Sequence, residues 1–205
     1  VDCIYRRLDD TFLDPKVFNK ESLIGVPGLF KCWKKGNVGI INALGTGVAD
    51  DKAVYSYVNK MIVYYLGEQP KLNQVETFLC ENKVHRQHVI ENIAKLVVKP
   101  ANASGGYGIM IGPKAPKKER DEMVKKIKKN PRDFVAQPLE ILSTIPTICE
   151  NGIEPRHLDL RPFILTGKTS YVTTGGLTRV ALRKGSTIVN SSQGGGSKDT
   201  MVVDA

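Results

Sequence analysis

Residues 96–113 read LVVKPANASGGYGIMIGP, and this stretch indicates more about the fold than any other part of the chain. An apolar run ends in Lys99 and Pro100, a glycine-rich loop follows, and a second apolar run begins at Ile109. This pattern predicts a strand, a loop and a second strand. Glycines let backbone N–H groups approach an anion closely, and Lys99 adds a positive charge beside them. The stretch therefore predicts a phosphate-binding hairpin.

The order of lysine and glycines separates this hairpin from other nucleotide-binding loops. A Walker loop and a dinucleotide fingerprint both lead into a helix, whereas a strand is predicted here. In protein kinases the glycine loop comes before its lysine, whereas Lys99 comes before the loop. An ordinary glycine-rich hairpin beside a surface lysine is the alternative interpretation of the same residues.

Composition indicates a globular protein with a real core. The chain has 205 residues, of which 41% are hydrophobic and 25% charged, so disorder is not expected. No apolar run of about 18 residues is present, so no membrane span is predicted. Because the chain begins at Val1 as though in mid-protein, we expect a piece of something longer. Four dispersed cysteines without a C-x-x-C pair predict reduced, mostly buried thiols and a cytoplasmic protein.

The net charge of +9 raises nucleic acid as a partner. Much of this charge lies in residues 114–129, KAPKKERDEMVKKIKK, which predict a helix with a narrow apolar stripe. No aromatic residue is interleaved with these lysines, as a stacking surface for single strands requires. A solvated helix face is therefore the favoured interpretation, and nucleic acid is not expected.

The N-terminal third holds one charged cluster and one predicted helix. Arg6 and Arg7 stand beside two aspartates, and they indicate either a salt-bridged turn or a contact to an anionic group. A helix is predicted to open at residues 50–52 with Asp50 or Asp51 as its cap, and Gly67 is predicted to end it. His85 and His88 lie three residues apart in a later predicted helix, where paired surface histidines are the favoured reading.

The last third is predicted to be rich in strands. Residues 157–165, 170–174, 177–182 and 187–190 read as an antiparallel meander, with a turn at Gly175 and Gly176. Strand alternation places Asp159 and Arg161 on one face. Residues 191–200 form a loop with three consecutive glycines between two strand-like runs, which favours a binding loop.

These segments resemble, in the same order, the circularly permuted ATP-grasp family of type 2. The family is related to glutathionylspermidine synthetase, and its genes lie beside those for alpha-E proteins and transglutaminases. The resemblance rests on YRRLDDTFLDP, NALGTGVADDKAV, VVKPANASGGYGI, HLDLRPF, GGLTRVAL and VNSSQGGGSKDT, so it covers essentially the whole chain. It implies an α+β fold in which two lobes with antiparallel sheets enclose a nucleotide cleft.

The same resemblance divides the chain into three parts. Residues 1–50 are expected to continue from a preceding region, which makes the chain the C-terminal portion of a longer family member. Residues 51–136 are expected to form an ATP-grasp lobe that carries the glycine hairpin. Residues 137–205 are expected to form a second lobe, rich in strands.

The resemblance also implies roles for individual residues around ATP and Mg²⁺. A bend after residue 137 is expected to offer main-chain groups to adenine, and because Pro138 has no N–H, the donor is Leu139 or Glu140. The assigned residues are Lys52 and Lys99 for the ATP phosphates; Gly105, Gly106 and Gly108 for a lid; Gln137, Leu139 and Glu140 for adenine and ribose; Asp159 and Asn190 for magnesium; and Arg161 and Arg179 for the γ-phosphate and the acyl phosphate.

Such ligases phosphorylate a carboxylate with ATP, and an amine then displaces the phosphate to form an amide. The implied substrate is a peptide or a related amino compound. One departure stands out, because many ATP-grasp enzymes carry a metal-binding acid two residues before the asparagine, where this chain has Ile188. The alternative is therefore a non-catalytic ATP-grasp-like module that assists alpha-E or transglutaminase-type proteins.

Overall fold

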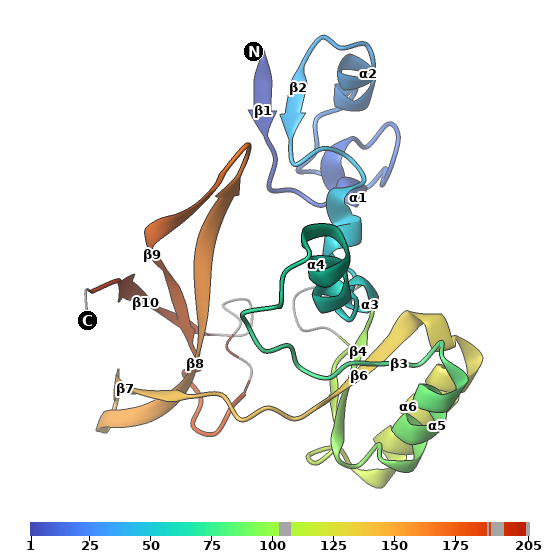
Figure 1. The fold of residues 1–205 in the computed structure, drawn as a ribbon, viewed down its shortest axis with the longest axis vertical. Coiled ribbons are helices and arrows are strands. Elements are labelled where there is room, and N and C mark those ends of the chain that lie inside the picture. The colour runs from blue at the N-terminus through green and yellow to red at the C-terminus, as the bar shows by residue number, and fades with distance from the viewer. Residues whose placement is uncertain (103–107, 188, 190–194, 204–205) are drawn as a thin grey trace.

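The computed structural model describes residues 1–102, 108–187, 189 and 195–203, and it shows a mixed α+β protein (Figure 1). The described strands form one two-stranded sheet and two four-stranded sheets. Both four-stranded sheets are antiparallel throughout, which confirms the expected α+β class with antiparallel sheets.

The N-terminal part is built around a parallel pair of short strands. Its elements are β1 (Cys3–Tyr5), α1 (Asp10–Leu13), α2 (Leu29–Lys34) and β2 (Gly39–Ile41). Arg6 follows β1 and is buried, and its guanidinium donates to the carbonyls of Leu8, Asn42 and Ala43 and to the carboxylate of Asp10. This arginine therefore fits the salt-bridged turn and not the contact to a substrate anion.

The helix predicted to run from Asp51 to Gly67 is divided in the structure. A 3-10 turn, η1 (Thr46–Asp50), leads into α3 (Lys52–Tyr55) and then α4 (Val58–Leu66). The Asp51 side chain accepts a hydrogen bond from the Ala53 N–H at 2.7 Å, and Gly67 ends α4 with a φ of 67°, so both predicted ends are confirmed. The helix breaks after Tyr55 because the Ser56 hydroxyl and N–H both bond back to the Ala53 carbonyl.

The first four-stranded sheet holds the main core. Its strand order is β3–β6–β4–β5, and two helices pack on one face (Figure 1). The elements are β3 (Phe78–Leu79), α5 (Lys83–Glu91), β4 (Leu96–Pro100), β5 (Met110–Ile111), α6 (Lys117–Lys129), η2 (Pro131–Asp133) and β6 (Phe134–Pro138).

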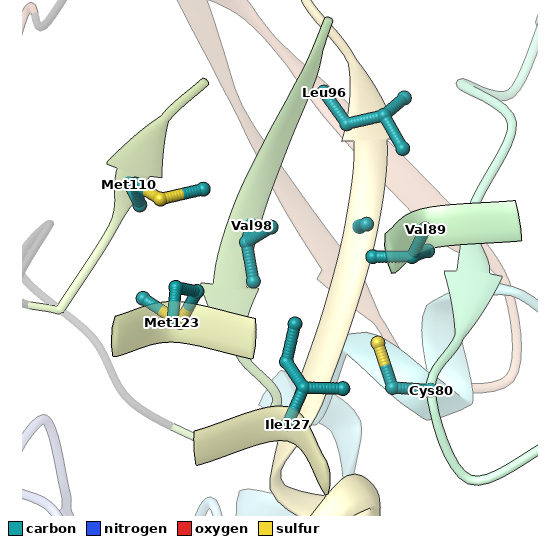
Figure 2. Packing of buried hydrophobic residues seen from close by; sticks show 8 residues of the cluster. Cys80, Val89, Leu96, Val98, Met110, Met123 and Ile127 are labelled. Atoms are coloured by element: carbon teal, nitrogen blue, oxygen red, sulfur yellow. The ribbon is translucent and has the colours of Figure 1, made fainter. Parts of the chain in front are cut away.

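Side chains from both helices meet the sheet in this core (Figure 2). Met123 and Ile127 of α6 point at Val98 of β4, while Val89 of α5 packs near Cys80. The lysines of α6 are exposed on the other side of the helix, so the predicted narrow apolar stripe and solvated face are confirmed.

The second four-stranded sheet has the order β10–β9–β8–β7. It consists of β7 (Thr144–Cys149), β8 (Gly152–Thr166), β9 (Ser170–Val180) and β10 (Gly196–Met201). The predicted antiparallel pairing of the strand at 157–165 with the strand at 170–174 is confirmed, but residues 177–180 continue the same strand, β9. The described residues Thr187 and Val189, from the strand predicted at 187–190, are not in a strand. β7 was not expected, and β10 takes up half of the predicted binding loop at 191–200.

The predicted turn at Gly175 and Gly176 is wrong, because both glycines lie inside β9. A Cβ atom at Gly176 would lie 2.9 Å from the Arg161 carbonyl oxygen, and one at Gly175 would lie 3.2 Å from the Thr200 carbonyl oxygen. These glycines therefore allow neighbouring strands to approach closely, which is the other use of glycine in a strand.

The cysteines correct one further expectation. All four thiols are free, but only Cys80 is buried, while Cys3 and Cys32 are exposed. Burial raises the pKa of the Cys80 thiol to about 11, so this thiol stays protonated at neutral pH.

Among the described residues, no helix is both long and apolar enough to cross a membrane.

Candidate functional site

Lys99 lies on the face of the first sheet that the helices do not cover. Strand alternation directs Leu96 and Val98 toward the helices and Lys99 away from them, which agrees with the core packing (Figure 2). The register pairs Lys99 with Val135 and Val97 with Gln137. Lys99 and Gln137 are therefore diagonal neighbours, and the Lys99 Nζ donates to the Gln137 Oε1 at 2.6 Å.

The Gln137 side chain is held in place by hydrogen bonds at both ends of its amide. It is buried, and its Nε2 donates to the Thr77 hydroxyl at 2.8 Å. Both ends of the amide are thus bonded, which leaves the carbonyl oxygen directed at Lys99. The resemblance assigned Gln137 to adenine and ribose, and the structure places its side chain beside the lysine assigned to the phosphates. Thr77 is a part of this arrangement that the sequence did not predict, because its role depends on the pairing of β3 with β6.

Lys52 joins Lys99 from a different element. It is the first residue of α3, and its N–H donates to the carbonyl oxygen of Ala101, just beyond β4, at 2.8 Å. Burial lowers the pKa of Lys99, and the nearby charge of Lys52 lowers it further. Burial also lowers the pKa of Lys52, although Asp51 and Asp50 oppose this shift. We call Lys52 and Lys99 the lysine pair.

The two strands predicted on either side of the glycine loop are confirmed, with β4 antiparallel to β5 and Val98 opposite Met110, while residues 103–107 of the loop lie outside the described residues. Gly108 has a φ of 71°, and a Cβ atom there would lie 2.9 Å from the Pro100 Cγ. A side chain is therefore excluded at this position by both backbone conformation and space. Gly105 and Gly106, the other two lid residues of the prediction, lie outside the described residues.

A second charged group lies on the β8–β9 pair, where Asp159 and Arg179 stand directly opposite each other. The Arg179 Nε donates to the Asp159 Oδ1 at 3.2 Å, and the Arg179 Nη2 donates to the Oδ2 at 2.9 Å. The Arg161 Nη2 also donates to the Asp159 Oδ2, at 3.1 Å. We call these three residues the arginine–aspartate cluster. It carries one more positive than negative charge, which suits an anion.

Asp159, one of the two residues assigned to magnesium, binds both arginines of this cluster. Both carboxylate oxygens of Asp159 are engaged by guanidinium groups. Across the part of the chain that the structure describes, no three histidine, cysteine or acidic side chains gather as a metal site. Asn190, the other assigned ligand, lies outside the described residues, as does Ile188. The described donors therefore do not fit a magnesium site by themselves.

The remaining assigned residues follow β6 directly. Leu139 is half-buried and Glu140 is exposed.

Two histidines have structural roles. The His85 Nδ1 accepts a hydrogen bond from the Leu79 N–H at 3.2 Å. His157 likewise bonds through its Nδ1 to the Leu142 carbonyl at 2.8 Å.

A mainly apolar cavity of about 440 Å³ lies between α4 and the loop at residues 68–74. Tyr55, from α3, lines it, and the Tyr55 hydroxyl accepts a hydrogen bond from the Val75 N–H at 3.0 Å. Two residues later, Thr77 holds Gln137. The same short segment thus contacts both Tyr55, in the cavity wall, and Gln137, which accepts a hydrogen bond from Lys99. No sequence pattern predicted this cavity.

Comparison with known proteins matches residues 1–181 to the family described as circularly permuted ATP-grasp type 2. A protein of Synechocystis, uncharacterised by name, is 55% identical over 204 residues, which cover 99% of this chain and 42% of that protein. An equally uncharacterised protein of Mycobacterium tuberculosis is 52% identical over 204 residues, which cover 99% of this chain and 37% of that protein.

A Frankia casuarinae protein with the provisional name glutamate–cysteine ligase 2-2 is 46% identical over 202 residues. The match covers 98% of this chain but only 23% of that protein, so its name does not by itself describe the matched segment. This chain therefore spans less than half the length of these relatives.

Proposed function

Because the chain belongs to the circularly permuted ATP-grasp type 2 family, we propose that it supplies the nucleotide-binding part of an ATP-dependent carboxylate–amine ligase. In such a ligase a carboxylate takes the γ-phosphoryl group of ATP, and an amine then displaces phosphate to leave an amide. The proposed substrate is a peptide or a related amino compound, and the proposed location is the cytoplasm. The name of the Frankia relative, which describes the joining of a carboxylate to an amine, agrees with this reaction.

The lysine pair is the observation that carries the proposal. The backbone of Lys52, at the start of α3, is bonded to Ala101, two residues after Lys99, and both lysines are partly buried. In such a place charge interactions are stronger than in water, and the charge of Lys52 lowers the pKa of Lys99. The described contact of the Lys99 Nζ is with a neutral amide oxygen, so the positive charge is not neutralised there. A polyphosphate carries the negative charge that the amide oxygen of Gln137 does not offer to Lys99, and we propose that its oxygens bind Lys52 and Lys99.

The arginine–aspartate cluster is proposed to hold the transferred phosphoryl group. Arg161 and Arg179 lie on adjacent strands, and the guanidinium geometry suits phosphate oxygens. Asp159 orients both arginines. Since the described donors do not form a magnesium site, no step is assigned to the metal, although the family generally uses ATP with Mg²⁺. We further propose that residues 51–136 and 137–205 act as two lobes around the nucleotide, after an N-terminal segment at 1–50.

Nucleotide affinity of matched lysine variants tests the proposal. Lys99→Met is expected to weaken ATP binding by about tenfold or more, because it removes one charge-assisted contact. Lys114→Met is the control, since Lys114 is exposed and its Nζ lies 3.4 Å from the Gly185 carbonyl. Isothermal titration of both variants measures the difference. Equal affinities for ATP in the two variants would remove Lys99 from the site.

A second candidate function is a non-catalytic binding module for a peptide-modification system, with alpha-E or transglutaminase-type proteins as proposed partners. It is favoured by the engagement of Asp159 by two arginines and by Ile188 in place of an acid. The two candidates differ in turnover. The chain joined to the additional segments of its longer relatives, supplied with ATP, Mg²⁺ and candidate amines, should release ADP and an amide if it is a ligase. Binding of ATP without either product supports the module.

A further inference from the structure

The outer half of the β8–β9 hairpin, residues 162–172, exposes large apolar side chains. We call this segment the hairpin tip, and Figure 1 shows that it projects away from β7 and β10. Five large side chains of the tip are each more than half exposed: Phe163 54%, Ile164 57%, Leu165 57%, Tyr171 56% and Val172 55%. Lys168, in the turn, is the only charged residue among the 11 residues of the tip.

These apolar side chains occupy both faces of the hairpin. The register pairs Ile164 with Val172 and Leu165 with Tyr171, and paired residues point to the same side of a sheet. Because successive residues alternate, the Ile164 pair and the Leu165 pair point to opposite sides. A hairpin that packs on a protein surface through one side needs only one apolar face. Two exposed apolar faces therefore favour a partner that contacts both sides of the hairpin.

No third strand supports the tip within the described residues. β7 pairs with β8 only over Gly152 to His157, and β10 pairs with β9 only from Gly175 onward. A two-stranded hairpin is marginally stable in water by itself, and an exposed apolar surface of this kind marks an interaction site. The tip is therefore incomplete as an independent element.

The relatives indicate what covers it. They match this chain over 99% of its length, yet the matched segment is only 42% and 37% of the Synechocystis and Mycobacterium proteins. More than half of each relative lies outside the match, so in these proteins a large further stretch of polypeptide belongs to the same chain as the matched segment. We propose that the hairpin tip inserts between two apolar walls of the polypeptide that family members carry outside the matched segment.

Grafting tests this proposal. The 205-residue chain replaces the matching segment of the Synechocystis relative, and amide hydrogen exchange is compared between the graft and the chain alone. Amides at 163–165 and 171–172 are expected to exchange about tenfold or more slowly in the graft. The amides of α6, which are structured in both proteins, serve as the internal reference.

Charged substitutions then test the insertion of both faces. Ile164→Lys and Leu165→Lys each place a charge on one face, and Lys168→Gln in the turn is the matched control. Both face variants are expected to lower the unfolding temperature of the graft by several degrees while leaving that of the chain alone nearly unchanged. If the graft does not fold, the same pair of substitutions is made at the aligned positions of the intact Synechocystis protein.

Three outcomes would overturn the proposal. Equal exchange in the graft and the isolated chain would show that the tip has no partner in the longer polypeptide. Sensitivity to only one of the two face variants would show that the tip lies on a single wall. Concentration-dependent protection of the isolated chain, with a dimer in sedimentation, would identify a second copy as the partner.

Discussion

At the scale of single residues, Asp14 is a buried carboxylate that organises the N-terminal part. It is 0% exposed, and it accepts hydrogen bonds from the N–H groups of Lys16, Gly28 and Phe30 at 2.9, 3.0 and 3.0 Å. Two of these donors stand at the start of α2. Burial by itself would raise the pKa of Asp14, but the three N–H donors outweigh it and the pKa is lowered.

Replacing Asp14 with alanine is expected to destabilise the protein by about 3 kcal/mol, because buried N–H donors are left without acceptors. Denaturant unfolding at neutral pH measures the loss. Asp9→Ala is the matched control: it removes another aspartate from the same region, one that caps α1 from an exposed position, and is expected to cost about 1 kcal/mol. A smaller loss for Asp14 than for Asp9 would contradict this account.

Asp14 also predicts a dependence on acid. Since its folded pKa lies below that of the unfolded chain, about 3.9, its stabilising effect is complete above that value. The effect is lost as pH falls through the lower folded pKa. Asp14→Asn should therefore be less stable than the parent at neutral pH, and the difference should shrink in strong acid. Unfolding curves of both proteins across this range test the sign.

The lysine pair predicts proton uptake when a polyphosphate binds. Burial lowers the pKa values of both Lys52 and Lys99 in the free protein, whereas a bound anion raises them. Between the lowered pKa and the ordinary lysine value of about 10.4, ATP binding should therefore take up protons. Titrations in two buffers with different ionisation enthalpies measure this uptake. Lys99→Met should reduce it, and an unchanged uptake would assign the protons elsewhere.

At the scale of elements, the register of β8 and β9 decides which charges meet. Asp159 is opposite Arg179, whose side chain is 17% exposed, whereas Arg161 is 50% exposed. A double-mutant cycle on stability should give a coupling of about 1 kcal/mol for Asp159 with Arg179. The same cycle with Arg161 should give less than about 0.5 kcal/mol, because exposed ion pairs contribute little. Equal couplings would contradict the register argument.

The packing of α6 on the first sheet gives a separate prediction. Ile127 is 0% exposed and contacts the core of the sheet (Figure 2). Ile127→Ala should cost about 2–5 kcal/mol through lost burial and the cavity left behind. Lys125→Ala, on the exposed side of the same helix, should change stability by less than about 0.5 kcal/mol. Thermal and denaturant unfolding of the two variants check this contrast.

Local patterns predicted the elements that depend on local chemistry. The cap at Asp51, the end at Gly67 and the apolar stripe of α6 are confirmed because each depends on residues within a few positions. The turn predicted at Gly176 is wrong because the glycine is needed for the close approach of the Arg161 backbone, and Arg161 is 15 positions away in the chain. The bond from Gln137 to Thr77 likewise depends on strand pairing, which a local pattern does not specify.

At the scale of the whole molecule, the two groups of charged residues lie on different four-stranded sheets and their neighbouring elements. The lysine pair lies where α3 meets β4, and the arginine–aspartate cluster lies on β8 and β9 (Figure 1). The resemblance implies which residues take part, and that assignment stays a prediction. The partners that hold them, a buried glutamine for the lysine and an aspartate for both arginines, became visible only in the folded chain.

The net charge of +9 gives the last prediction. Its largest concentration lies on α6, which contains no residue of the lysine pair or of the arginine–aspartate cluster. The lysines of α6 are exposed, and none of them forms an ion pair among the described residues. We expect them to keep the protein soluble and to give only weak, salt-sensitive retention on nucleic acid. The variant to test replaces Lys125, Lys126, Lys128 and Lys129 with glutamine.

This variant should lose most of its retention on immobilised DNA at low salt, while the parent should already be released near 0.15 M salt. Its affinity for ATP and its unfolding free energy should both stay within about 0.5 kcal/mol of the parent values, because these lysines contact neither the core nor the lysine pair. Tight, sequence-dependent DNA binding that survives physiological salt and disappears in the variant would instead make α6 a nucleic-acid interface. The charge would then belong to a function that the ATP-grasp family does not explain.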